Sequence, residues 1–338
     1  MITPSFGLTA TERVLPRLAL DLTTASLDAR VTFTRTGDTA TVVNSSGVIV
    51  GINANLPRFD YDPTTLVCKG LLIEEERTNL LLNSLIDGTN LATQSVTVTA
   101  AAHTLSFYGT GIVALTGAHT ATVNGLGAYP TRTTLTFTPT AGSLTLTVTG
   151  DVKFANLTLG VFPTSFIPTA GVAVTRNVDR PTMTGTNFTD WFNASEGTLF
   201  VEGQTSWSAT PASSAFRTLA RIYSADGNSS ISNVYQFDGA GTSVVRDAGV
   251  TQASMVSGTL TSNVVKQAIA YKANDFAFVR NAGTVQTDVS GTVPANLTVM
   301  NIGTTRDFSA LGTLNGHIRK IYFYPQRLTN AEVQAITK

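Results

Sequence analysis

The sequence predicts an all-β protein with more than one antiparallel sandwich, and three observations support this. Charged residues make up 13% of the chain and aromatic residues 8%, while Thr, Gly, Ala, Val, Ser and Asn supply most of the rest; this mix is typical of short strands joined by tight polar turns. Apolar and polar residues alternate with period two over many short runs. The 338 residues suffice for two or three domains with separate cores.

The first 88 residues predict a β-rich N-terminal arm. Val31, Phe33 and Arg35 alternate as in a half-buried strand, and the stretch 44–47, Asn-Ser-Ser-Gly, is typical of a hairpin turn. The stretch 70–84, GLLIEEERTNLLLNS, also allows a short helix with Leu72, Glu76 and Leu80 on successive turns, although no clear cap precedes it. Both readings of 70–84 stay open.

Residues 89–176 have the strongest period-two pattern and predict an antiparallel sandwich or jelly roll. Leu135 and Phe137 share one face of a strand, and Leu144, Leu146 and Val148 repeat the rule after the turn Pro-Thr-Ala-Gly. The two runs therefore predict a pair of strands joined as a hairpin.

A polar segment, 177–190, reads as a connector, and a second sandwich follows over 191–338. We assign Trp191, at the start of this sandwich, to core or linker packing. Near the end, Thr329 is a helix N-cap followed by apolar Val333 and Ile336, which predicts one short C-terminal helix.

The charge balance excludes several classes of function. The 22 basic and 22 acidic side chains cancel, so no uniform field draws the chain to nucleic acid or an anionic membrane, and near-zero net charge suits a subunit that assembles. Cys68 is the only cysteine, which excludes an intrachain disulfide. The N-terminus does not read as a secretion signal, and no apolar run is long enough to span a bilayer. We expect a protein made in the cytoplasm, without membrane insertion.

Three stretches resemble segments of tail, fibre and decoration proteins of tailed bacteriophages. They are FTRTGDTATVVNSSGVIVGINANLPRFDYDP (33–63), GLLIEEERTNLLLNS (70–84) and DVKFANLTLGVFPTSFIPTAGVAVTR (151–176). The resemblance implies a virion location, other virion proteins as partners, docking through the N-terminal arm, and a homo-oligomer such as a trimer on a symmetric axis.

The C-terminal third resembles a concanavalin-A-like, or laminin-G-like, lectin sandwich. The resemblance is carried by an opening GTLFVEG, a YKANDFAFVRNAG hairpin and a closing NGHIRKIYFYPQRLTNAEVQAIT. It implies a strand leading into a short terminal helix, and glycan binding, which most members perform while a minority cleave glycans. The predicted fold is thus an N-terminal β-rich arm, a jelly-roll sandwich, a concanavalin-A-like sandwich and a short C-terminal helix.

Catalytic patterns are weak. Glycoside cleavage needs two facing carboxylates, and the glucanase branch of the lectin-like family carries them as alternating acids on one strand, whereas LFVEGQTS offers Glu202 alone. The acidic triplet 74–76 beside Arg77 is typical of a salt-bridged, solvated or interface stretch. The sequence has no phosphate-binding glycine loop with a following lysine and no Gly-x-Ser-x-Gly elbow. We therefore expect no enzyme.

Metal patterns are weak as well. His103, His119 and His317 lack the spacing of a zinc site and are expected to be structural. Turn residues Asp226, Asn228 and Asp238 could supply oxygens to Ca²⁺, but Asp-Gly and Gly-Asn are equally ordinary in hairpin turns. We expect no cofactor, with Ca²⁺ as the alternative.

Four residues are candidates for carbohydrate binding, because sugars stack on aromatic rings and bond to neighbouring polar groups. Trp207 lies in a polar loop, and Tyr235, Arg221 and Asn228 come from neighbouring strands or turns. The alternative for Trp207 is that it plugs a sandwich edge or contacts a neighbouring subunit.

The favoured hypothesis is a phage structural protein, from a fibre, a tail or a capsid decoration, whose outer sandwich attaches multivalently to host-surface glycan. One alternative is a virion-associated or secreted polysaccharide depolymerase. The other is a purely architectural cement protein without a ligand.

Overall fold

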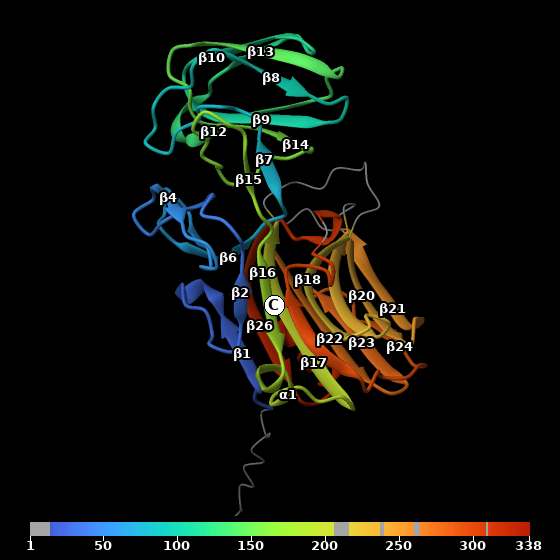
Figure 1. The fold of residues 1–338 in the computed structure, drawn as a ribbon. Helices are drawn as coiled ribbons and strands as arrows, with labels where there is room; N and C mark the ends of the chain where they lie inside the picture. Colours follow the sequence, from blue (N-terminus) through green and yellow to red (C-terminus); the bar gives the residue numbers. More distant parts are fainter. Residues whose placement is uncertain (1–13, 206–215, 237–239, 260–263, 309) are drawn as a thin grey trace, which may run out of the picture.

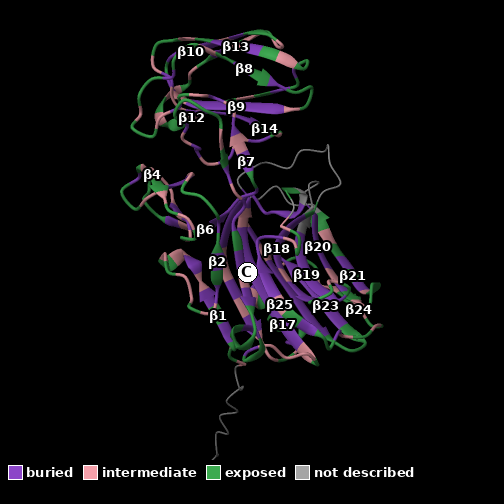
Figure 2. Cartoon of the chain, in the orientation of Figure 1, coloured by how far each residue is buried: buried purple, intermediate pink, exposed green. Residues whose placement is uncertain are grey.

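The protein is described by a computed structural model that covers residues 14–205, 216–236, 240–259, 264–308 and 310–338. The predicted all-β class is confirmed: the described chain consists almost wholly of antiparallel strands. Figure 1 shows two stacked bodies, a small sandwich above and a large sandwich below. Figure 2 shows that the buried residues concentrate on the strands of both bodies, whereas their connecting loops are more exposed.

The first sheet of the large sandwich has eight strands within the described residues. The edge strand β1 (Leu18–Asp21) pairs with β26, beside β6. In order, the other strands are β24 (Gln286–Asp288), β23 (Asp275–Arg280), β22 (Val264–Lys272), β17 (Glu196–Thr205), β26 (Gly316–Tyr324), β6 (Cys68–Ile73) and β5 (Phe59–Tyr61).

The second sheet of the large sandwich packs face to face with the first. Its side chains Ile222, Val245 and Met300 meet Leu199, Tyr271 and Phe323 of the first sheet in one buried core. In order, its described strands are β2 (Thr32–Thr34), β16 (Arg180–Thr184), β25 (Leu297–Ile302), β18 (Phe216–Ser224), β19 (Ser230–Gln236), β20 (Ala240–Asp247) and β21 (Val250–Thr259).

The N-terminal segment 1–88 differs from the predicted arm, because its strands β1, β2, β5 and β6 belong to the two sheets of the large sandwich. Leu20, Phe33 and Leu71 enter the same core as the C-terminal strands, and burying this apolar surface favours integration over a free arm. The stretch 70–84 contains strands β6 and β7 (Arg77–Asn79) and no helix.

The segment 177–190 also differs from the predicted connector. It contains β16, which lies between β2 and β25, and the short helix α1 (Thr186–Thr189). The alternate residues Pro181 and Met183 are buried. This polar stretch therefore has the alternating burial of a strand. Trp191, which follows α1, is buried in the core as predicted.

The small sandwich has a core of its own, formed by residues such as Leu105, Phe107, Val113 and Leu146. Within the described residues, one sheet contains β11 (Ala121–Asn124), β10 (Ile112–Gly117), β13 (Gly142–Thr149) and β8 (Gln94–Val98), and the other contains β12 (Gly127–Phe137), β9 (His103–Gly109) and β14 (Lys153–Leu159). The chain enters along β7 and leaves along β15 (Val174–Arg176), which pair with each other.

The predicted hairpin at 139–142 is wrong, although both of its strands exist. β12 pairs with β9 and β13 pairs with β10 and β8, so the turn crosses from one sheet to the other. The alternation of apolar and polar residues specifies which face of a strand is buried. It does not specify which other strand pairs with it.

Two local predictions are confirmed. β3 (Ala40–Val43) and β4 (Ile49–Ile52) form a hairpin whose turn contains Gly47 at φ +76°, where a Cβ would lie 2.7 Å from the carbonyl oxygen of Pro63. The C-terminal helix α2 (Asn330–Ile336) begins with a capping box between Thr329 and Glu332. Two 3-10 turns, Leu22–Thr24 and Ala310–Gly312, complete the described elements, and none of the described helices could span a membrane.

Candidate functional site

A groove lies on the outer face of the second sheet of the large sandwich, over strands β18 to β21. Its volume is about 330 Å³. The strand register places Arg221, Ser232, Val244 and Ser254 in one row across the sheet. Alternate residues on the same strands, such as Ile222, Ile231 and Val245, face the core, so period-two alternation directs the groove residues outward.

Two guanidinium groups, of Arg221 and Arg246, line this groove. Within the described part of the chain, neither has a carboxylate or other hydrogen-bond partner, and the Nε of Arg221 is buried and unpaired. Burial lowers the pKa of Arg221, and the neighbouring charge of Arg246 lowers it further, whereas Tyr223 and the charge of Asp307 act in the opposite direction. The Arg221 guanidinium also lies over the ring of Tyr223, 5.8 Å from its centroid. The groove therefore holds two cations close together without a paired anion.

The remaining wall combines hydroxyl groups with a small apolar surface. Val234 and Val244 supply aliphatic surface, and Phe216 lies half exposed at one end. The hydroxyl-bearing residues are Thr218, Ser230, Ser232, Thr251, Ser254 and Thr305. Cations, hydroxyl groups and apolar contacts in one concave site suit a ligand that has negative charge, hydroxyl groups and a hydrophobic face.

Of the four residues predicted to bind carbohydrate, the structure places Arg221 in the groove. Asn228 lies instead in the exposed turn between β18 and β19, where its backbone N–H and its amide both donate to Asp226. Trp207 and the side chain of Tyr235 lie outside the described residues. The prediction missed Arg246 and the serines of β19, which the alternation of Ser230, Ser232 and Val234 could have revealed.

The residues proposed as calcium ligands do not form a calcium site within the described part of the chain. The Asp226 carboxylate accepts hydrogen bonds from Ser224 Oγ at 2.5 Å and from Asn228, and these bonds lower its pKa. Asp238 lies outside the described residues. Across the described ranges, no three His, Cys, Asp or Glu side chains gather as metal ligands.

Of the carboxylates considered for catalysis, Glu202, Glu74 and Glu75 are ion-paired. Glu202 on β17 accepts a hydrogen bond from Arg319 Nε at 2.7 Å. Glu74 and Glu75 are buried in ion pairs, as the salt-bridge interpretation of the triplet predicted, while Glu76 is exposed.

The buried ion pairs form a network where the two sandwiches meet. Glu74 contacts Arg58 at 2.7 Å and Arg176 at 2.9 Å, and Asp179 contacts Arg58 and Arg35. These cations and the bonds from Ser165 hold the pKa of Glu74 well below its usual range despite its burial. The network joins the N-terminal segment, the strand that leaves the small sandwich and the segment 177–190.

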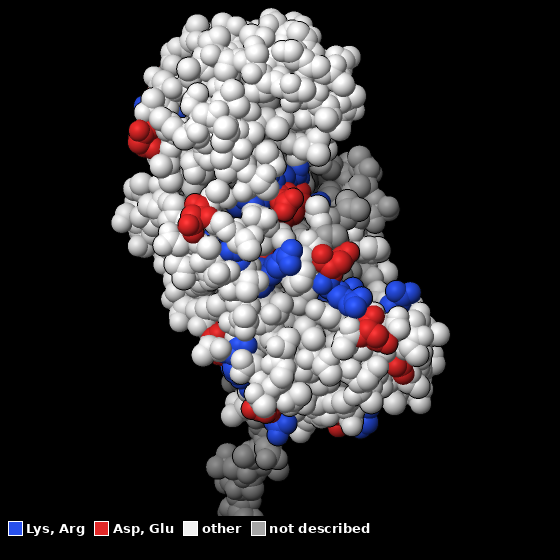
Figure 3. Space-filling model, viewed as in Figure 1, with Lys and Arg blue, Asp and Glu red and all other residues white. Residues whose placement is uncertain are grey.

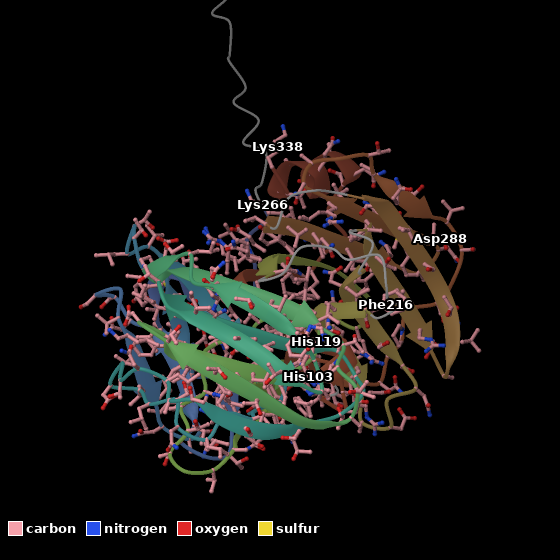
Figure 4. The ribbon with its side chains drawn as sticks, turned by 90° about the horizontal axis from the view of Figure 1, so that it is seen from above. His103, His119, Phe216, Lys266, Asp288 and Lys338 are labelled. Atoms are coloured by element: carbon pink, nitrogen blue, oxygen red, sulfur yellow. The ribbon has the colours of Figure 1, made fainter. Side chains whose placement is uncertain are left out.

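The histidines lie in two places. Figure 4 shows His103 and His119 close together on the small sandwich, where both rings lie against Phe137. His317 is buried on β26, and its Nε2 lies 2.9 Å from a carboxylate oxygen of Asp60. Burial lowers the pKa of His317, so the neutral ring donates from Nε2 to Asp60.

No protein-family model matches the sequence, and no curated protein sequence matches it either. Among solved structures, the CBM40 module of the Ruminococcus gnavus IT-sialidase bound to α2,6-sialyllactose is similar, with 13% identity and a TM-score of 0.36 over 43% of this chain and 85% of the module.

Two further similar structures are the NanB sialidase of Streptococcus pneumoniae and a heptameric SAP-like pentraxin from Limulus polyphemus. NanB has 11% identity and a TM-score of 0.35 over 46% of this chain and 26% of its own. The pentraxin has 11% identity and a TM-score of 0.34 over 43% and 70%. Since each likeness covers less than half of this chain, we infer its function from the groove.

Proposed function

We propose that this chain is a non-enzymatic protein that binds acidic glycans in the groove over β18 to β21. The observation that supports this most strongly is the pair of guanidinium groups, Arg221 and Arg246, that line the groove without an anionic partner among the described residues. Arginine binds carboxylate and sulfate groups through two parallel hydrogen bonds, and such charge-assisted bonds are stronger than neutral ones.

The rest of the groove supports a sugar as the bearer of that charge. Serine and threonine hydroxyls can both donate to and accept from sugar hydroxyls, and Val234 and Val244 offer a surface for the C–H face of the ring. A single groove of this kind gives modest affinity, so several copies on one assembly would strengthen attachment.

Binding of the full chain to immobilised acidic and neutral polysaccharides of matched length tests the proposal. Arg221→Met and Arg246→Met should each weaken binding to the acidic polymer at least tenfold. Arg180→Met is the matched control, because Arg180 lies on the same sheet, on β16, and does not line the groove. Equal binding of acidic and neutral polymers by all four proteins would refute the proposal.

We further propose that the protein belongs to a phage particle and presents this groove to the host surface. The three stretches that resemble tail, fibre and decoration proteins support this location. Electron microscopy of virions labelled with an antibody against 191–338 tests it: label at fibre ends or the tail tip agrees with attachment, label over the capsid indicates decoration or cement, and no label contradicts a virion role.

The depolymerase alternative predicts release of reducing sugars from the bound polysaccharide, and loss of that release in Glu202→Gln. We expect no release, because the candidate acid Glu202 is already ion-paired with Arg319 and glycoside cleavage needs two facing carboxylates.

A further inference from the structure

A second cavity, separate from the groove, lies where three parts of the chain meet. It has a volume of about 190 Å³, enough for about six water molecules at roughly 30 Å³ each. The hairpin β3–β4 contributes Val43 and Ile49, the first sheet of the large sandwich contributes Asp60 and Lys69, and the small sandwich contributes Arg132. Ligand sites occur preferentially at such junctions.

Arg132 stands out among the residues of the small sandwich. Residues 89–175 contain three charged side chains, Arg132, Asp151 and Lys153, and the last two pair with each other at 2.9 Å. Figure 3 shows the same contrast on one face of the molecule, where the upper body is almost free of charged side chains, whereas they gather below it. The one remaining charge of this sandwich therefore lies at the junction cavity.

The two carboxylates of the cavity wall, Asp60 and Glu74, already form salt bridges. Asp60 pairs with Lys69 at 2.5 Å and accepts from His317, and Glu74 pairs with Arg58 and Arg176. Arg132 has no carboxylate partner within the described residues: one Nη donates to the carbonyl oxygen of Thr164 at 2.7 Å, and its Nε is buried without a partner. Its guanidinium lies 5.5 Å from the centre of the Tyr108 ring. Arg132 is therefore a cation of the wall that has no salt-bridge partner among the described residues.

The hydrogen-bonding groups left on this wall include the cationic donors of Lys69 and Arg132 and one buried acceptor, the Nδ1 of His317, which has no partner among the described residues. Lys69 and Arg132 keep unused N–H groups, and neither side chain can accept a hydrogen bond. The hydroxyl of Ser165 is already engaged by Glu74, Arg58 and Arg176. The rest of the lining is largely apolar, from Val42, Val43, Ile49, Leu72 and Phe166. An occupant must therefore offer acceptors and negative charge on a small apolar body.

We propose that this cavity binds a small organic carboxylate, with its carboxylate on Arg132 and its apolar body against the hairpin β3–β4 and Phe166. This site is distinct from the groove, since the two share no lining residue. Its ligand would contact the hairpin, the large sandwich and the small sandwich at once.

The test is calorimetric titration of the full chain with sodium benzoate and with benzamide, a neutral molecule of nearly the same shape. Benzoate should bind saturably and at least tenfold more tightly than benzamide. Arg132→Met should weaken benzoate binding at least tenfold, whereas Arg221→Met, the groove variant, should leave it unchanged. Ile49→Trp, which fills the cavity without altering a charge, should also abolish binding.

Three outcomes would overturn the proposal. They are equal binding of benzoate and benzamide, unchanged benzoate affinity in a folded Arg132→Met protein, and no saturable binding of benzoate at millimolar concentration. Loss of benzoate binding in Arg221→Met but not in Arg132→Met would place the carboxylate in the groove and overturn it as well. Thermal unfolding of each variant verifies that it is folded.

Discussion

Replacing Asp179 by Asn should destabilise the protein strongly, because Asp179 is the anion that holds two buried arginines. Its side chain is fully buried, contacts Arg35 at 3.0 Å, and also pairs with Arg58. It accepts the backbone N–H of Glu74 at 2.9 Å as well. The amide of Asn removes the negative charge. It also replaces one acceptor oxygen by an NH₂ donor, which would face the N–H donors of Arg35, Arg58 or Glu74.

The size of the effect follows from the burial of the partners. Breaking a buried ion pair by removing one partner costs about 3–5 kcal/mol, since the other charge stays buried and uncompensated. Against a total stability of about 5–15 kcal/mol, this is a large loss. It should appear in urea unfolding as a lower midpoint with a similar slope.

The matched control is Asp28→Asn. Asp28 also pairs with an arginine, Arg30, at 2.7 Å, but both side chains are about a third exposed, and an exposed pair contributes less than about 1 kcal/mol. If Asp179→Asn loses no more stability than Asp28→Asn, the network does not hold the N-terminal segment and 177–190 together, and our reasoning fails.

Two further predictions concern stability. Acid should destabilise the protein through Asp60. Although burial raises the pKa of Asp60, the hydrogen bond from His317 and the charge of Lys69 lower it from 3.8 to about 2. Since one pKa unit is about 1.36 kcal/mol, roughly 2 kcal/mol present above pH 4 is lost as the pH falls toward 2, and Asp60→Asn should remove this step from unfolding curves measured against pH. The lowered pKa of His317 acts in the same direction from about pH 6.5 downward. A protein more stable at pH 4 than at pH 7 would contradict the His317 prediction, and one as stable at pH 2 as at pH 4 would contradict the Asp60 prediction. Trp191→Ala should cost about 3–5 kcal/mol, because the ring is 2% exposed and packs 5.0 Å from the centroids of Phe188 and Phe323; a loss below 1 kcal/mol in urea unfolding would contradict its place in the core.

The candidate groove could be predicted only in part. Arg221 was identified from its position near polar turns, whereas Asn228 is occupied by the local bonds of its own turn. Arg246 and Ser254 come from strands that follow later in the chain, and the register of β20 and β21 brings them beside β18 and β19. The triplet 74–76 was predicted to be a salt-bridged, solvated or interface stretch, but the partners of Glu74, Arg58 and Arg176, could not be named, because they are distant in sequence.

Features that depend on residues close together in the chain could be predicted from the sequence alone. The hairpin turn at 44–47 follows from a glycine with positive φ, the capping box of α2 from Thr329 and Glu332, and the all-β class from period-two alternation. The pairing of the strands became known from the three-dimensional fold: β12 and β13 lie in different sheets, and β1, β2, β5 and β6 complete the large sandwich. The reason is physical, since alternation specifies the buried face of a strand, whereas its hydrogen-bonded neighbour depends on how distant apolar faces share one core.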